Sequence, residues 1–297
     1  MSPTVSVVVA TYNRSGMVGT AIRSVLAQTH RDTEVIVVDD CSPDDTAATV
    51  AAIDDPRVRY VRHDRNRGLP AGRNTGIRAA TGEFVAFLDD DDAWLPTKLE
   101  RQLALQAPAV LCAALVDGTV VKSYDKPTVT LARLRRGNTF DPSSLMVRRE
   151  LIASLGFDEN LRLGEDWDAF IRIAEHAPIA YLPEPLLVYN NGAHARMTNE
   201  SRFGDVDLAE RLRVVEKHRS FFGEFWYRYH CADTALSYVA SRSDRAGLVR
   251  EAVHHYGLLP VLSVLASRAA ARVATRRALA RRRGTCSSSA LVIRRAG

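Results

Sequence analysis

The stretch "FVAFLDDDDAW" (residues 84–94) joins an apolar run directly to four consecutive aspartates. Phe84–Leu88 is short and has no polar alternation, which is typical of a strand buried on both faces of a parallel sheet. The aspartates, Asp89–Asp92, cannot all be buried and ionised without partners, because an uncompensated buried carboxylate is very costly. We therefore expect them at the C-terminal end of a strand, beside a divalent cation.

Three further runs have the same character, and helix-like segments separate them: Val5–Thr11, Glu34–Asp39 and Val58–Val61. This alternation predicts an α/β fold with a mostly parallel central sheet flanked by helices. Helix starts are predicted at Ser42, with Pro43 in the first turn and Asp45 completing a capping box, and at Thr97 with Glu100.

Beyond residue 107 the pattern is less regular. Ser144–Val147 and Ile179–Leu182 are predicted strands, Glu165–His176 is a predicted helix, and the chain from Asp205 onward is mainly helical. A domain boundary is placed near residue 200.

Composition excludes several classes of protein. With 297 residues, 46% hydrophobic, the chain has ample material for a large core. The longest largely apolar run, Gly257–Ala266, falls short of the roughly 20 residues of a membrane-spanning helix. Strand-like residues begin at Val5, so no cleaved signal peptide is expected. The four cysteines show no C-x-x-C spacing, which argues against a zinc site or disulfide framework and favours a cytoplasmic location.

Two acidic clusters, Asp39–Asp40 and Asp89–Asp92, each lie between the end of a strand and the start of a helix. In open α/β sheets this position is the crevice that binds ligands. Carboxylates suit Mg²⁺ or Mn²⁺, with phosphate oxygens as further ligands. A nucleotide diphosphate is therefore the predicted ligand; the alternative is that each cluster is a solvated turn before a helix.

Five motifs resemble the family 2 glycosyltransferases of the GT-A fold, in the family's order and approximate spacing. They are "VSVVVATYNR" (5–14), "VDDCSPDD" (38–45), "NRGLPAGRNTGIRAATGEFVAFLDDDDAWLPTKLERQ" (66–102), "SSLMVRRELI" (143–152) and "GEDWDAFIRIAE" (164–175). The resemblance covers about residues 3–200. It implies a Rossmann-type GT-A domain over 1–200, with a donor half at about 1–105 and an acceptor half at about 106–200, followed by a helical C-terminal region over 201–297.

The resemblance also implies roles for individual residues. Nucleotide and donor binding falls to Thr11, Asn13, Asp39, Asp40, Arg73, Asp89 and Asp90. Asp91 and His194 are implied as ligands of Mg²⁺ or Mn²⁺, although which of the four aspartates serves which role stays open. The acceptor side would be formed by Glu165, Trp167 and Trp94, and the two tryptophans could equally be core anchors.

Asp166 is implied as the general base. Direct displacement at an anomeric carbon needs a carboxylate opposite the leaving diphosphate, to take the proton of the incoming hydroxyl. Because an unperturbed aspartate has a pKa of about 3.9, we expect Asp166 to be ionised at neutral pH.

The reaction that the resemblance implies is metal-dependent, inverting transfer of a sugar from a nucleotide diphosphate, UDP above all, to a hydroxyl of a glycan, a lipid-linked molecule or a small molecule. A catalytically inactive nucleotide-sugar-binding protein is the alternative. A phosphoacceptor module would need its acidic pair after the first strand, where "ATYNR" stands, and a nicotinamide-dependent oxidoreductase would need G-x-G-x-x-G there.

Basic charge is concentrated at the C-terminal end. Residues 251–297 contain nine Arg, no Lys and one Glu, a net charge of +8 in a chain of +5. Leu258, Leu262, Leu265 and Ala269 follow helical spacing, although Arg276 projects close to the direction of Leu258. This tail is expected on an anionic membrane surface, packed on the catalytic domain, or disordered; nucleic acid is not an expected partner.

Overall fold

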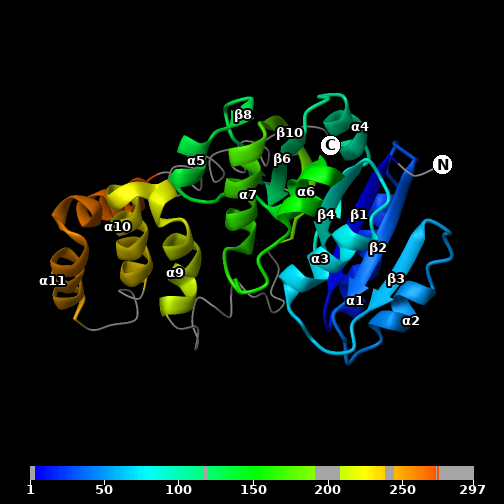
Figure 1. The fold of residues 1–297 in the computed structure, drawn as a ribbon, viewed down its shortest axis with the longest axis horizontal. Helices are drawn as coiled ribbons and strands as arrows, with labels where there is room; N and C mark the ends of the chain where they lie inside the picture. Colours follow the sequence, from blue (N-terminus) through cyan, green and yellow to red (C-terminus); the bar gives the residue numbers. More distant parts are fainter. Residues whose placement is uncertain (1–3, 117–119, 191–207, 238–243, 272, 274–297) are drawn as a thin grey trace, which may run out of the picture. The chain divides into compact units, whose positions relative to one another are not determined.

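The computed structural model describes residues 4–116, 120–190, 208–237, 244–271 and 273. The chain forms two compact units, Met1–Val214 and Val215–Gly297, and each is described by itself. The first unit is a mixed α/β structure built on one sheet, and the second is helical (Figure 1). The predicted fold class, with helices after the α/β domain, is confirmed.

One sheet of ten strands forms the centre of the first unit. Its order is β3-β2-β1-β4-β9-β6-β10-β5, with β7 paired to β6 and β8 paired to β10. The strands are β1 (Val5–Thr11), β2 (Thr33–Asp39), β3 (Val58–Arg62), β4 (Phe84–Asp89), β5 (Ala93–Trp94), β6 (Ala109–Val116), β7 (Val120–Lys122), β8 (Thr128–Val129), β9 (Met146–Arg148) and β10 (Ile179–Tyr189).

Helices flank this sheet and make up the second unit. Those of the first unit are α1 (Ser15–Leu26), α2 (Thr46–Ala51), α3 (Leu69–Ala79), α4 (Lys98–Leu103), α5 (Leu131–Arg135), α6 (Arg149–Leu155) and α7 (Glu165–His176). α9 (Leu208–Lys217) follows, then α10 (Arg219–Ser237) and α11 (Arg245–Tyr256), and residues 258–271 are also helical. No helix in the described part of the chain is long and apolar enough to cross a bilayer.

The four N-terminal parallel strands bring both acidic clusters to one edge of the sheet. β1 lies between β2 and β4, so that Thr11 pairs with Asp39 and Ala10 pairs with Asp89. Every residue of β1 and β2 is buried, as expected for strands covered by helices on both faces. Since parallel strands end at the same edge, the turns after β1, β2 and β4 meet there.

The helix after β2 begins three residues later than predicted, with Asp45 rather than Ser42 as its N-cap residue. α2 starts at Thr46, because Ser42 is used differently: its N–H donates to Asp39 Oδ1 (2.8 Å) and its Oγ accepts from Asn13 N–H (2.9 Å). Serine stabilises turns as readily as helix starts. The prediction at Thr97 is confirmed in position, since α4 begins at the next residue, but Thr97 makes no side-chain capping bond.

The second half of the sheet departs further from the predicted pattern. Residues Pro142–Ser144 form a 3₁₀ turn, and the strand predicted from Ser144 is β9, beginning at Met146 and antiparallel to both β4 and β6. β10 runs on to Tyr189, well beyond Leu182. The predicted bounds of α7 are confirmed at both ends.

α3 packs so closely on β1 that Gly76 has no room for a side chain and Gly72 has little. A Cβ on Gly76 would lie 2.2 Å from Val8 Cγ1, and one on Gly72 would lie 3.2 Å from the Ala10 Cβ. We expect Gly76→Ala to lower the free energy of unfolding by about 1–3 kcal/mol, because the added methyl overpacks the core. Urea unfolding measures this change, and Gly16→Ala in α1 is the matched control, since its Cβ meets nothing within 4 Å. Equal stability of the two variants would contradict the prediction.

Candidate active site

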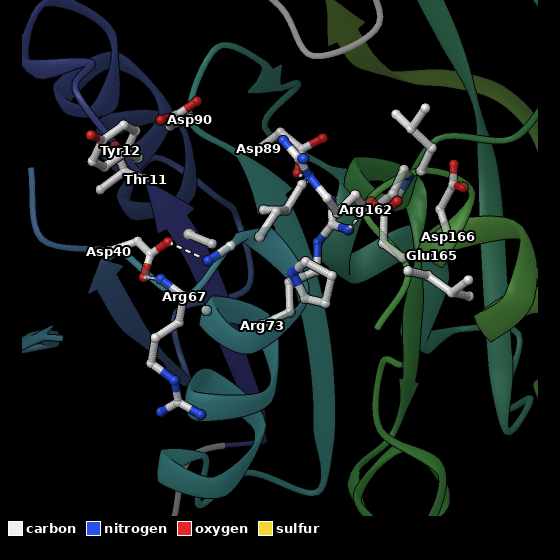
Figure 2. Close-up of a pocket in the computed structure, with 18 of the residues that line it drawn as sticks. Thr11, Tyr12, Asp40, Arg67, Arg73, Asp89, Asp90, Arg162, Glu165 and Asp166 are labelled. Atoms are coloured by element: carbon white, nitrogen blue, oxygen red, sulfur yellow. Dashed lines mark hydrogen bonds and ion pairs between the residues drawn. The ribbon is translucent and has the colours of Figure 1, made fainter. Parts of the chain in front are cut away.

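A cavity of about 510 Å³ opens at the edge where the parallel strands end. The turns after β1, β2 and β4 and the start of α3 line it from one half of the unit, and the segments before and at the start of α7 line it from the other (Figure 2). Of the predicted site residues, it brings together Thr11, Asp40, Arg73, Asp89, Asp90, Asp91, Glu165 and Asp166.

Asp40, directly after β2, lines the cavity and fixes the backbone of residues 67 and 68. Its two carboxylate oxygens accept from the N–H groups of Arg67 (2.8 Å) and Gly68 (2.7 Å), and Oδ1 lies 2.7 Å from His63 Nδ1. Asp39 is placed otherwise: it is fully buried and pairs with Arg62 Nη1 at 2.8 Å. Asp39 is not among the described residues that line the cavity, and neither is Asn13. Of the acidic pair after β2, only Asp40 reaches the cavity.

The loop after β4 presents three of its four aspartates to the cavity: Asp89, Asp90 and Asp91. The Arg14 guanidinium supplies a counter-charge, with Nη1 2.7 Å from Asp90 Oδ1 and 3.1 Å from Asp91 Oδ2. Burial raises the pKa of Asp90 to about 6, and Arg14 opposes this shift. The loop therefore concentrates negative charge at the cavity, beside the guanidinium of Arg14.

Asp92, the fourth aspartate, and Trp94 anchor this loop through hydrogen bonds to Ser143. Asp92 accepts from Ser143 Oγ (2.7 Å), and Trp94 Nε1 donates to the Ser143 carbonyl (2.8 Å). The Lys98 ammonium lies 3.8 Å from the centroid of the Trp94 ring. Trp94 is 4% exposed and is not among the described lining residues, so its placement is that of the core anchor, because its ring packs between the sheet and α4.

Arg73 connects the two walls of the cavity. It is only 2% exposed, and its guanidinium donates to Asp89 Oδ1 (2.8 Å) and to Glu165 Oε1 (2.9 Å), beside the Phe157 ring. Burial raises the pKa of Glu165, and the charge of Arg73 opposes that shift. Arg73 and Glu165 are thus partners of each other, and the guanidinium ties the end of β4 to the start of α7.

Asp166 lies next to this pair, and its pKa is higher than that of the unperturbed carboxylate expected from the sequence. Burial, followed by the negative charge of Glu165, raises the pKa of Asp166 to about 7. Asn138 Nδ2 donates to its Oδ2 (2.7 Å), and the N–H of Trp167 donates to its Oδ1 (2.6 Å). A carboxyl group with a pKa near neutrality is well matched to general-base work.

Trp167 contacts α5 and does not line the cavity in the described structure. Its Nε1 donates to the Leu134 carbonyl (2.9 Å), and it is not among the described lining residues. The bond joins the start of α7 to α5. Trp167 therefore fixes the backbone that carries Asp166.

The carboxylates of the β4 loop fit a hard divalent cation. No group of three His, Cys, Asp or Glu side chains that could hold a metal by itself occurs among the residues described. Mg²⁺ commonly takes one or two carboxylates and completes its coordination with phosphate oxygens and water. Asp89 and Asp91 fit that pattern. His194, the other predicted ligand, lies outside the described residues.

Three residues that the sequence analysis did not single out belong to the site: Arg14, Asn138 and Arg162. Arg162 lines the cavity, and in Figure 2 its side chain lies between Asp89 and Asp166. Arg14 follows a conspicuous strand end, so its position was a usable signal. Asn138 and Arg162 stand in irregular segments, where nothing in the local pattern marks them.

Comparison with known proteins gives consistent findings. The family model described as "Glycosyl transferase family 2" matches residues 6–153. The succinoglycan biosynthesis protein ExoO of Rhizobium meliloti is 40% identical over 188 residues, 56% of this chain and 54% of ExoO. The putative teichuronic acid biosynthesis glycosyltransferase TuaG of Bacillus subtilis is 41% identical over 190 residues, 60% of this chain and 75% of TuaG. The match thus spans about half of ExoO and three quarters of TuaG.

Solved structures share the fold. S. aureus TarS (residues 1–349) in complex with UDP-GlcNAc superposes with a TM-score of 0.66 at 20% identity, covering 86% of this chain and 80% of that one. The mannosyltransferase PcManGT from Pyrobaculum calidifontis, in complex with GDP-Man and Mn²⁺, superposes with a TM-score of 0.58 at 22% identity, covering 92% and 81%.

Proposed function

Because this chain belongs to glycosyl transferase family 2, we propose that it transfers a sugar, with inversion, from a nucleotide diphosphate donor to a hydroxyl group during the assembly of a polysaccharide or glycoconjugate. UDP is the nucleotide we propose. The observation that carries the proposal is that Asp89–Asp91, Arg73 and Asp166 all line the same cavity. In our proposal the aspartates would bind the donor, and Asp166, whose pKa is raised to about 7, would act on the acceptor.

The donor half of the cavity suits a nucleoside diphosphate. Thr11 and Asp40 lie where the base and ribose would bind, and Asp40 is held by two backbone N–H groups. Arg162 lines the cavity, and its guanidinium would pair with phosphate oxygens. The UDP-GlcNAc bound to TarS supports this choice of ligand.

A divalent cation, Mg²⁺ or Mn²⁺, completes the proposed donor site. Asp91 would hold it together with Asp89, and the cation would offset the charge that develops on the departing diphosphate. Arg14 pairs with Asp90 and Asp91 in the same loop. The Mn²⁺ in the complex of PcManGT supports this part of the proposal.

Asp166 acts as the base in this proposal. It removes the proton of the incoming hydroxyl while that oxygen attacks the anomeric carbon and the diphosphate leaves from the opposite face. Asn138 and the Trp167 N–H hold its two oxygens in place. Arg73 keeps Glu165 charge-paired beside it, so that the start of α7 stays aligned with the donor carboxylates.

The proposed base makes the reaction depend on pH in a defined direction. Only the ionised carboxylate accepts a proton, and burial raises the pKa of Asp166 to about 7. We expect kcat/KM to rise about tenfold per pH unit up to pH about 7 and then to level off. Initial rates between pH 5 and pH 9, each measured at a saturating Mn²⁺ concentration, give this profile.

Asn138→Ala separates the base from other titrating groups. Loss of the donated hydrogen bond favours the neutral form of Asp166, so the acidic limb should move to higher pH. Calorimetric titration with UDP and Mn²⁺ over the same pH range shows how much of the fall in kcat/KM at low pH is due to weaker donor binding. If weaker donor binding explained the whole fall, and the pH of the fall were the same in Asn138→Ala, Asp166 would not be the base.

A donor screen tests the activity as a whole. The protein is incubated with Mn²⁺, each of several UDP-sugars and a mixture of glycan acceptors, and UDP release and product mass are measured. Acceptor-dependent UDP release supports the proposed transferase. Binding of UDP without any transfer would favour the alternative, an inactive nucleotide-sugar-binding protein.

A further inference from the structure

Residues 258–271 form a helix with two unlike faces in the second unit. Val261 and Val264 on the inner face are fully buried and pack in one cluster with Ala232 and Leu236 of α10 and with Ala252 of α11. Arg268 is also turned inward, with Nη2 2.7 Å from Asp233 Oδ1 and Nη1 donating to the Leu236 carbonyl at 2.9 Å. These contacts fix which face points outward.

The outward face is apolar. Leu258, Leu259, Leu262 and Leu265 are 57%, 70%, 51% and 38% exposed. They recur on one side of the helix, which also exposes alanines and Val273. The structure describes ten exposed large hydrophobic side chains, and half of them lie between residues 258 and 273. A contiguous apolar surface of this kind marks an interaction site.

The chain adjoining this face selects the partner. Within 258–271 the only charged residue is the inward-turned Arg268, whereas residues 272–297 carry eight Arg and no acidic residue. An exposed apolar stripe followed in the sequence by many arginines complements a surface that is anionic outside and apolar just beneath. A second copy of the chain would bring two strongly positive segments together, and a nucleic acid would leave the leucines in water.

We propose that the face formed by Leu258, Leu259, Leu262 and Leu265 inserts into the interface of an anionic lipid bilayer, to which the net positive charge of the sequence that follows also attracts the chain. The helix lies along the bilayer surface and does not cross it. This inference does not depend on the proposed transfer reaction. The helix predicted from the leucine spacing thus has a buried face of valines and an exposed face of leucines. Arg276, which was predicted to project close to Leu258, lies outside the described residues.

Vesicle flotation tests the proposal on the full chain. The probes are vesicles of phosphatidylcholine alone and of phosphatidylcholine mixed with phosphatidylglycerol. We expect binding to the anionic vesicles, weakened by salt because charge contributes to it. The triple variant Leu258→Ser, Leu259→Ser, Leu262→Ser should bind these vesicles about tenfold or more weakly, since three leucines that are each more than half exposed no longer enter the interface.

Matched variants make the outcome decisive. Leu105→Ser, at a leucine 42% exposed in the first unit, should bind as the unaltered chain does. Replacing Arg281, Arg282 and Arg283 by Gln should reduce the preference for anionic vesicles. Circular dichroism confirms that each variant is folded. Undiminished binding by the leucine variant would overturn the proposal, as would a dimer in light scattering that the leucine variant converts to monomer.

Discussion

Asp166→Asn is expected to lower kcat by about 10²–10⁴-fold, the range by which a positioned general base accelerates a reaction. The neutral amide cannot accept the proton of the incoming hydroxyl. UDP affinity should be nearly unchanged, because Asp166 lies on the α7 wall, away from the β4 loop that holds the diphosphate in our proposal. Initial rates and calorimetric titration with UDP measure the two quantities separately.

A matched control comes from Glu159, which also lines the cavity but is paired with the exposed Arg67. Glu159→Gln should keep kcat within a few-fold of the unaltered chain. If Asp166→Asn retained a comparable rate, Asp166 could not be the base, and Glu165 would be the next carboxylate to replace.

Replacement of Arg73 by Met should have the largest effect on stability. The guanidinium is 2% exposed and pairs with Asp89 and Glu165, of which Glu165 is 7% exposed. Removing one partner of a buried ion pair leaves an uncompensated charge, which typically costs about 3–5 kcal/mol. We expect the free energy of unfolding, measured with urea, to fall by about that amount.

Arg67→Ala is the control for Arg73. Arg67 also forms an ion pair within the cavity, but its side chain is 38% exposed and that of its partner Glu159 is 39% exposed. A pair this exposed contributes about 0–1 kcal/mol. The double variant Arg73→Met, Glu165→Gln should recover part of the lost stability, because the stranded charge is removed. Equal losses for Arg67→Ala and Arg73→Met would contradict the role assigned to Arg73.

The part of the fold that sequence predicts well is the part where local pattern and burial agree. The parallel strands β1, β2 and β4 are continuous apolar runs because helices cover both faces, so their ends, and the acidic turns after them, could be placed from sequence. α7 was predictable at both ends because its amphipathic spacing is regular.

Predictions failed where one local signal serves two structures. Ser42 carries the signal of a helix start, yet it stabilises the turn before the helix by bonding Asn13 and Asp39. For Trp94, which follows an acidic motif, the sequence left open a sugar-stacking role and a core anchor, and the structure buries its ring beside Lys98. Which way a side chain turns depends on packing across the sheet, which a local stretch does not encode.

The properties of the site come from contacts between distant segments. Asp166 is 28 positions from Asn138, and Arg73 is 92 positions from Glu165. Neither pairing has a local signature, so the raised pKa of Asp166 and the charge pairing beside it could not be expected from sequence. The type of chemistry was accessible from motif spacing, whereas the tuning of the base required the structure.

The most direct test of the account is calorimetric titration of the full chain with UDP, with and without Mn²⁺, repeated on Asp91→Ala. We expect UDP binding that strengthens markedly with Mn²⁺ and a loss of that metal dependence in the variant, because Asp91 would no longer hold the cation against the diphosphate. UDP binding of equal strength in all four titrations would contradict the proposed donor site.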